Sequence, residues 1–191
     1  MITTCSPKHF DLVKERGADV AYDYVRGRGG RFPASGADLD QHEQDVGKRI
    51  RQETGGKLTT VFDTVATEST MTICADAIGP EGGIACVVLP VDSPRKDIEA
   101  RFFLGYDLKG ESYILEGDEY PAKPELFEFA KKIVLLAEKL WAEGKWKPHP
   151  QRVEGGGLLG AVAGMQRMRE GKGPSGEKWV YLIDETPWPE T

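Results

Sequence analysis

Apolar and polar positions alternate along the first half of the chain in a way that predicts strands separated by helices. Short apolar or β-prone runs are expected to be strands, and stretches with helical periodicity are expected between them. The predicted strands are residues 1–5, 19–24, 58–65, 83–89 and 101–108, and the predicted helices are 6–17, 45–53 and 68–78. This order is typical of an α/β fold with a parallel sheet.

The first predicted helix has clear boundary signals. Ser6 suits the N-cap, Pro7 suits the first helical position, and Gly17 suits the end of the helix. A strand that runs directly into such a helix is the usual beginning of a βαβ unit.

Beyond Gly110 the pattern changes to a long amphipathic helix over residues 126–144, followed by shorter elements. Apolar residues recur on one helical stripe, which is expected to face a core. The later elements are predicted to be an extended piece at 149–153, a glycine-rich bend at 155–157, a helix at 158–171 and a strand at 178–183.

Residues 25–44 do not fit the pattern around them. The stretch VRGRGGRFPASGADLDQHEQ contains little that packs in a core, and strand-to-helix connections normally take about 2–6 residues. We expect an exposed, poorly ordered insertion at this place.

Composition and charge narrow the classes of function. The chain has 191 residues with 25 Lys and Arg against 31 Asp and Glu, and its net charge of −6 argues against whole-protein attraction to nucleic acid or to anionic membranes. No apolar run is long enough to span a membrane, and the N-terminus has no signal-peptide pattern. A cytoplasmic location without membrane contact is predicted.

The cysteines and histidines do not suggest a metal site. Three cysteines and three histidines are scattered along the chain, without the spacing of zinc ligands. The cysteines are expected to be free thiols, and no metal is expected.

Several motifs, taken in order, resemble the zinc-free medium-chain dehydrogenase/reductase superfamily. They are TTCSPKHFDLVKERGADVAYDY, GKLTTVFDTVA, FFLGYDLKG, AEGKWKPHPQRVEGG and SGEKWVYLI. Within that superfamily the chain looks most like the trans-acting enoyl reductases of fungal polyketide synthases. The resemblance implies an NADPH-dependent reductase of carrier-tethered enoyl thioesters in secondary metabolism, with a polyketide synthase as partner.

The resemblance begins in the middle of the family pattern, so the chain looks N-terminally truncated. It implies an incomplete Rossmann-type parallel sheet that lacks the first strand and its glycine-rich turn. In the strand order 3-2-1-4-5-6 this leaves a 3-2 pair and a 4-5-6 trio. The implied organisation is a partial NADP-binding domain at 1–111, the C-terminal part of a substrate domain at 112–184 and a tail at 185–191.

The residues after the first predicted strand are Cys5, Ser6, Pro7, Lys8 and His9. In dinucleotide-binding folds this place commonly carries an acid, which binds the ribose 2′-hydroxyl of NAD. Here no acid is present, and Ser6 and Lys8 instead offer a hydroxyl and a positive charge at a helix N-terminus, which favours NADP. In the purely structural alternative, Ser6 and Pro7 only begin the helix and Lys8 is a solvated charge.

The resemblance implies the same cofactor. It matches Ser6, Pro7, Lys8 and His9 to the family's adenosine-phosphate loop, and it matches Tyr24 to a second contact at the end of the third strand. These five residues are therefore the implied contacts of the adenosine phosphate.

Two further pairs match the family's cofactor contacts. Val88 and Leu89 match the backbone that meets the nicotinamide ring, and Pro174 and Ser175 match a late contact. Buried strand residues, for the first pair, and a turn before an edge strand, for the second, are the structural alternatives.

The substrate contacts implied by the resemblance are Phe102, Phe103, Leu104, Gly105 and Tyr106. An aromatic strand in the core is the alternative for this segment. No catalytic side chain is expected, because the cofactor of such an enzyme carries the chemistry. Asp63, at the end of an apolar strand, is expected to serve a turn.

The enoyl reductase hypothesis has two competitors. One is a non-catalytic truncated fragment with weak or no nucleotide binding. The remote one is nucleic-acid binding through the arginine- and glycine-rich residues 26–31.

Overall fold

The computed structural model describes residues 1–24 and 43–188. The chain forms two compact units, Met1–Lys139 and Leu140–Thr191. The insertion predicted at 25–44 and the arginine- and glycine-rich residues 26–31 fall outside the described part, apart from residues 43 and 44. Those two residues already belong to helix α2, so the boundary predicted at residue 44 was set too late.

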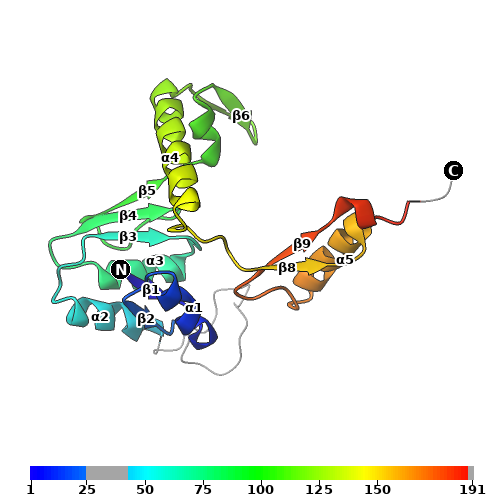
Figure 1. Ribbon diagram of the computed structural model, residues 1–191. Helices are drawn as coiled ribbons and strands as arrows, with labels where there is room; N and C mark the ends of the chain where they lie inside the picture. The colour runs from blue at the N-terminus through cyan, green and yellow to red at the C-terminus, as the bar shows by residue number, and fades with distance from the viewer. Residues whose placement is uncertain (25–42, 189–191) are drawn as a thin grey trace. The chain divides into compact units, whose positions relative to one another are not determined.

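The first unit contains a three-stranded parallel sheet (Figure 1), which packs on the larger of the two buried hydrophobic clusters among the described residues. Its strands lie in the order β3 (Thr60–Asp63), β4 (Gly83–Val87) and β5 (Ile98–Phe102). The register pairs Asp63 with Val87 and Val87 with Phe102, so all three strands end at the same edge. Predicted functional residues follow two of these strand ends.

Helix α3 (Glu68–Ala77) connects β3 to β4 and packs its apolar face on this sheet. Thr67 caps the helix by accepting a hydrogen bond from the Thr70 amide, which explains where the helix begins. Met71 of α3 and Val87 of β4 are both fully buried. Burial of such side chains stabilises the unit by about 1.5–3 kcal/mol each.

A second parallel sheet contains only β1 (Ile2–Thr4) and β2 (Val20–Tyr22). The crossover between them is the short helix η1 (Pro7–His9) followed by α1 (Phe10–Glu15). The division into a pair and a trio, expected for the 3-2 and 4-5-6 strands, is confirmed. One continuous helix was predicted from Ser6 to Gly17, but the structure divides it at His9.

Helices join the strand pair to the trio. Helix α2 (Glu43–Glu53) packs against α3, and Tyr22 is buried among Val46, Ile50 and Ala77. A second core thus lies between β2, α2 and α3.

Residues 101–108, predicted to be one strand, form two different structures. Strand β5 ends at Phe102, and Gly105–Lys109 forms the short helix η2. The apolar run FFL extended the predicted strand too far, because the chain leaves the sheet after Phe102.

A hairpin that the sequence analysis did not predict follows η2. Strands β6 (Tyr113–Leu115) and β7 (Asp118–Tyr120) pair antiparallel through Glu116 and Gly117, both with positive φ. Two central residues with positive φ are typical of a type I′ turn, in which Asn or Asp is the usual first residue. Because Glu116 occupies the first position, the sequence signal for this turn was weak.

Helix α4 (Pro124–Ala142) follows the hairpin and confirms the longest predicted helix, although it begins two residues earlier than 126. None of its 19 residues is buried in the structure. The boundary between the two compact units falls within this helix. The predicted division at residue 111, between the cofactor-binding part and the substrate part, concerns function and stays a prediction.

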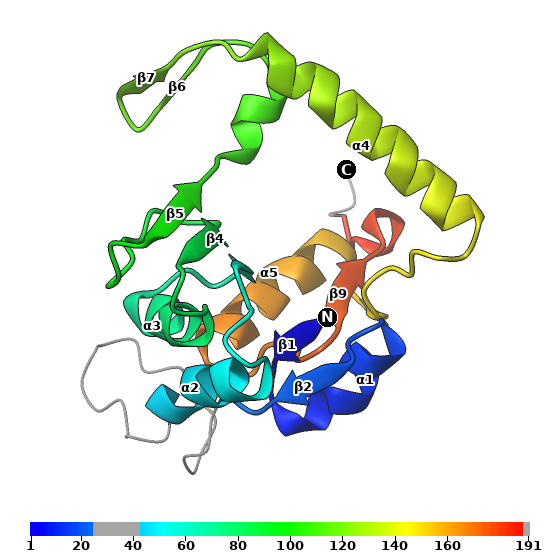
Figure 2. The same ribbon diagram turned by 90° about the vertical axis from the view of Figure 1, so that its left-hand side faces the viewer.

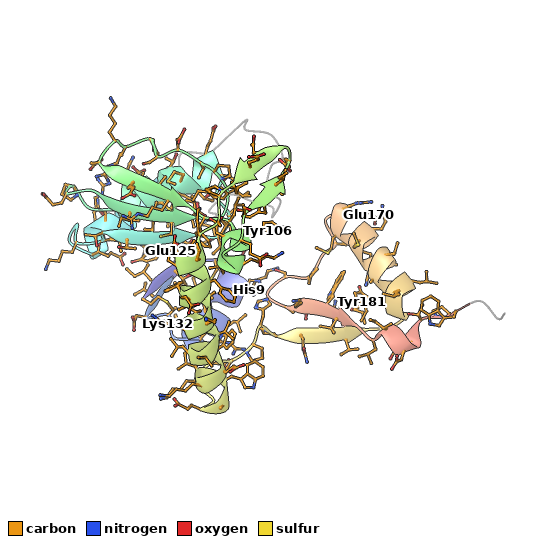
Figure 3. All side chains as sticks on the ribbon, turned by 90° about the horizontal axis from the view of Figure 1, so that it is seen from above. His9, Tyr106, Glu125, Lys132, Glu170 and Tyr181 are labelled. Atoms are coloured by element: carbon orange, nitrogen blue, oxygen red, sulfur yellow. The ribbon has the colours of Figure 1, made fainter. Side chains whose placement is uncertain are left out.

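The second unit is a small βαβ unit. Strands β8 (Gln151–Glu154) and β9 (Lys178–Tyr181) pair in parallel, and α5 (Gly157–Arg169) connects them. Tyr181 faces α5, as Figure 3 shows, and a Cβ at Gly164 would lie 2.0 Å from its hydroxyl oxygen. The predicted last strand is shorter than expected, because η3 (Ile183–Glu185) forms from Ile183 onward.

Candidate dinucleotide-binding site

The loop after β1 brings two of the predicted cofactor contacts together. Ser6 has the extended backbone of an N-cap, with φ −61° and ψ 142°, and Pro7 begins η1. Its hydroxyl makes no capping hydrogen bond and instead lies 3.4 Å from the Tyr24 hydroxyl. Ser6 and Pro7 thus begin the helix, as the structural alternative expected, but the Ser6 hydroxyl lies near Tyr24 instead of capping a helical amide.

The backbone explains why residues 18 positions apart meet. The Cys5 amide donates to the Tyr22 carbonyl at 3.0 Å, which extends the β1–β2 ladder by one step. Ser6 and Tyr24 leave the sheet just beyond this bond. Two hydroxyl groups are thus held side by side at the carboxyl end of the strand pair.

The charges around these hydroxyls have both signs. Lys8 is exposed and His9 is half-buried. Burial raises the pKa of the Cys5 thiol, and the nearby Asp23 carboxylate raises it further, so Cys5 stays a neutral thiol. Sequence reasoning missed Asp23, although its place directly after β2 and beside Tyr24 is a recognisable signal.

This donor set fits a phosphomonoester. Two hydroxyls, from Ser6 and Tyr24, supply hydrogen-bond donors, and the exposed Lys8 supplies a positive charge. Residues 5–9 contain no acid that would take a ribose hydroxyl in place of a phosphate. The hydroxyls and the positive charge can therefore accommodate the adenosine 2′-phosphate of NADP.

A second group of predicted contacts follows β4. Val88 packs against the buried core, whereas Leu89 is 55% exposed. Both residues lie beyond the sheet ladder, in a bend at the carboxyl end of the strand. Leu89 thus does not fit the alternative of a buried strand residue.

The loop after β3 lies beside this bend, because Asp63 is in register with Val87. The Asp63 carboxylate accepts hydrogen bonds from the amides of Val65 and Ala66 at 2.9 and 3.0 Å, and from the Thr70 hydroxyl at 2.6 Å. The predicted turn role of Asp63 is confirmed.

Ala66 in this loop was not singled out by the sequence. It has a φ of 56°, a left-handed conformation that is uncommon for a residue other than glycine, and it is buried. The hydrogen bonds of Asp63 hold the strained loop beside Val88. Such strain costs on the order of 1 kcal/mol and is often found near functional sites.

The predicted substrate contacts form a segment, Phe102–Tyr106, which we call the aromatic segment. Phe103 is 48% exposed and Tyr106 is 50% exposed, so the alternative of an aromatic core strand is wrong for both. Tyr106 lies on η2, as Figure 3 shows, and its ring is 5.6 Å from that of Tyr113.

The last predicted contacts, Pro174 and Ser175, belong to the second unit and precede β9. Their approach to the residues of the first unit stays a prediction. Within residues 1–24 and 43–188, the structure contains no group of His, Cys, Asp or Glu arranged to hold a metal ion. The helices of these same residues include none with the length and apolar character needed to cross a membrane.

Solved structures with a similar fold are enoyl reductases and related oxidoreductases. The JamJ enoyl reductase matches with a TM-score of 0.58 and 14% identity, over 93% of this chain and 45% of that chain. The mycobacterial protein Rv1454c complexed with NADPH matches with a TM-score of 0.60 and 17% identity, over 95% of this chain and 48% of that chain. Together with the two parallel sheets, these matches define a Rossmann-like α/β protein.

The sequence relatives define the family more narrowly. The chain is 35% identical to the trans-enoyl reductase ACTTS2 of Alternaria alternata over 185 residues, which are 96% of this chain and 48% of the relative. It is also 39% identical to the dual trans-enoyl reductase/FAD-dependent monooxygenase tazHJ of Aspergillus terreus. This match extends over 173 residues, which are 90% of this chain and 22% of the relative.

The resemblance found in the sequence is thus confirmed: fungal trans-enoyl reductases are homologues of this chain, with 32–39% identity over 90–96% of its residues. The chain spans about half the length of ACTTS2. No protein-family profile matches the chain.

Proposed function

We propose that this chain is the part of an NADPH-dependent enoyl reductase that binds the adenosine phosphate and contacts the substrate. The observation that carries the proposal is the 3.4 Å approach of the Ser6 and Tyr24 hydroxyls, with an exposed lysine, Lys8, two residues after Ser6 in the chain. Its sequence relatives are trans-enoyl reductases, which supports a polyketide-like enoyl thioester as the substrate.

When bound, NADPH would supply the hydride that reduces the α,β-double bond. The chain's own contribution is binding and orientation. Ser6, Lys8 and Tyr24 would hold the 2′-phosphate, and the backbone of Val88 and Leu89 would border the nicotinamide. The exposed aromatic segment would contact the acyl group.

The same proposal implies a partner protein and a cellular location. A polyketide synthase that carries the thioester is the proposed partner. The cytoplasm is the proposed location, and the free state of Cys5, Cys74 and Cys86 supports a reducing compartment.

A second candidate is nucleotide binding without turnover. The described residues supply contacts for the adenosine phosphate, but β1 leads into η1 through Cys5 and Ser6, without glycines that could hold a pyrophosphate. Placement errors of about 1 Å can cost a hundredfold in the rate of a transfer step. We therefore expect no oxidation of NADPH at 340 nm when the 191-residue chain is given a crotonyl thioester.

Binding of adenosine phosphates tests the main proposal. We expect the chain to bind 2′,5′-ADP more tightly than 5′-AMP, as measured by ligand-observed NMR titration. Lys8→Ala should weaken 2′,5′-ADP by about 1.5–3 kcal/mol and leave 5′-AMP nearly unchanged.

The control is Lys14→Ala, which removes another exposed lysine from α1. It should change neither affinity by more than the error of the titration. Equal affinities of the parent chain for the two nucleotides would contradict the assignment of the 2′-phosphate to Ser6, Lys8 and Tyr24.

A further inference from the structure

A buried carboxylate lies immediately after the aromatic segment. Asp107 is 7% exposed, and each of its oxygens accepts a hydrogen bond. Oδ1 accepts from the Tyr113 hydroxyl at 2.8 Å, and Oδ2 accepts from the Lys123 ammonium at 2.8 Å. One carboxylate therefore joins η2, the β6–β7 hairpin and the residue that precedes α4. Figure 2 shows the backbone of this part of the chain, in which the hairpin leads into α4.

The protonation states of Asp107 and Tyr113 favour the hydrogen bond between them. The hydrogen bonds from Lys123 and Tyr113 hold the pKa of Asp107 below its ordinary value, so the carboxylate stays charged. Burial and the hydrogen bond to Asp107 raise the pKa of Tyr113 to about 12, so the hydroxyl stays a donor. A buried charge costs free energy unless it is paired, and both partners are present here.

The same hydroxyl group fixes a row of aromatic rings. The Tyr113 ring stacks on that of Tyr120, with centroids 4.8 Å apart and planes 3° apart. The Tyr106 ring is tilted by 43° relative to the Tyr113 ring, with centroids 5.6 Å apart. The orientation of Tyr106 thus depends on Tyr113, whose hydroxyl is held by Asp107.

The aromatic segment is held at both ends. Phe102 is the last residue of β5 and pairs with Val87 in the sheet. At the other end, the Gly110 amide donates to the Asp107 carbonyl at 3.0 Å and closes η2. A Cβ at Gly110 would lie 2.8 Å from Cβ of Phe127, so η2 ends directly against α4.

We propose that Asp107 is a positioning residue that holds the aromatic segment in one conformation, so that Phe103 and Tyr106 form a preset apolar surface for the acyl chain of the thioester. The inference rests on the proposed function, which supplies the class of substrate. Groups that are fixed before the ligand arrives lose less conformational entropy on binding. A longer acyl chain covers more of this surface and depends on it more strongly.

The variant Asp107→Asn tests this role in the 191-residue chain. It keeps the size of the side chain but removes the charge that pairs with Lys123. We expect hydrogen exchange of residues 103–109 to increase at least tenfold, with no change in β3 and β4. Binding of a ten-carbon enoyl pantetheine thioester should weaken about fivefold, and that of the four-carbon thioester less than twofold.

Tyr113→Phe is the second variant, because it keeps the stacked ring and removes only the hydroxyl. It should also speed hydrogen exchange of residues 103–109 and weaken binding of the ten-carbon thioester, each by a smaller factor. If Asp107→Asn does not fold, this variant still tests the proposal. Asp118→Asn is the matched control, since it neutralises an exposed carboxylate of the same hairpin. It should change neither measurement.

The outcomes separate this inference from the proposed function. Unchanged exchange of residues 103–109 in both variants would overturn the positioning role. Faster exchange with unchanged thioester binding would leave Asp107 a structural role only and would also overturn it. If the parent chain bound neither thioester while exchange responded as expected, the proposed function would have failed, and the acyl surface with it.

Discussion

The two parallel sheets of the first unit differ in how they are stabilised. The β3–β4–β5 trio covers a core in which Met71, Ile78 and Val87 are fully buried. Of the residues in the β1–β2 pair, only Tyr22 is buried. The pair depends on α2 and on polar contacts of Tyr22, which donates to Glu53 and lies under the Arg49 guanidinium.

This difference concerns function, because the proposed contacts of the adenosine phosphate all follow the strands of the pair. Regions with few buried apolar contacts open more readily than the core of the same unit. We therefore expect the trio to carry the stability of the unit and the pair to gain order when a nucleotide binds. The predictions below test this contrast.

The largest effect is expected in the core of the trio. Met71→Ala should lower the free energy of unfolding by about 2–5 kcal/mol, because it leaves a cavity where Met71 is fully buried. Urea unfolding followed by circular dichroism measures the loss. The control is Met165→Ala, a methionine that is 57% exposed, which should change stability by less than about 0.5 kcal/mol. Equal losses would show that the trio core is not the main source of stability.

The next effect concerns the loop at the edge of the trio. Asp63→Ala should cost about 1.5–3 kcal/mol, because the amides of Val65 and Ala66 lose a charged acceptor. Asp63→Asn keeps one acceptor oxygen and should recover part of the loss. If both variants were as stable as the parent in urea, the carboxylate would not be what holds Ala66 in its left-handed conformation.

A smaller effect depends on pH and belongs to the pair. Burial and the hydrogen bond to Glu53 raise the pKa of Tyr22 to about 12 from the ordinary value of 10.0. A phenol with a raised folded pKa contributes stability that is complete below the unfolded value and is lost between about pH 10 and 12. We expect hydrogen exchange, corrected for its intrinsic pH dependence, to show β1 and β2 opening over this range.

Tyr22→Phe is the control for this pH effect, since it keeps the buried ring and removes the ionisable hydroxyl. In this variant the alkaline opening of the pair should disappear. Glu53 is exposed, so solvent screening keeps the contribution of the contact at about 1 kcal/mol or less. An alkaline opening that persisted in Tyr22→Phe would assign the titration to another group.

Sequence patterns predicted the elements of both sheets because local signals were strong. Apolar runs such as GIACVVL marked buried strands, and Ser6 with Pro7 marked the beginning of a helix. The patterns could not show the end of β5, because Phe103 and Leu104 are apolar yet leave the sheet. They also missed the β6–β7 hairpin, whose turn uses Glu116 in a conformation usual for Asn or Asp.

For the site, the strand order and the family resemblance located Ser6 and Tyr24, and the structure brings their hydroxyls together. Asp107 was missed because its role comes from contacts with Tyr113 and Lys123, 6 and 16 residues further along the chain. Such a cluster has no regular spacing. The left-handed Ala66 was missed for the same reason, since its strain is supported by Asp63 rather than by its own type.

The smallest predicted effect links the pair to its ligand. A nucleotide that binds only the folded pair stabilises it by about 0.4 kcal/mol when its free concentration equals the Kd. We therefore expect 2′,5′-ADP at that concentration to slow hydrogen exchange of residues 4–9 and 20–24 by about twofold. Residues of β3, β4 and β5 should exchange at an unchanged rate, because their stability comes from the core around Met71. With 5′-AMP at the same concentration, protection of the pair should be weaker, since the 2′-phosphate is what Ser6, Lys8 and Tyr24 are proposed to hold. Equal protection of both sheets would mean that the pair and the trio open together, and the contrast between them would then be wrong.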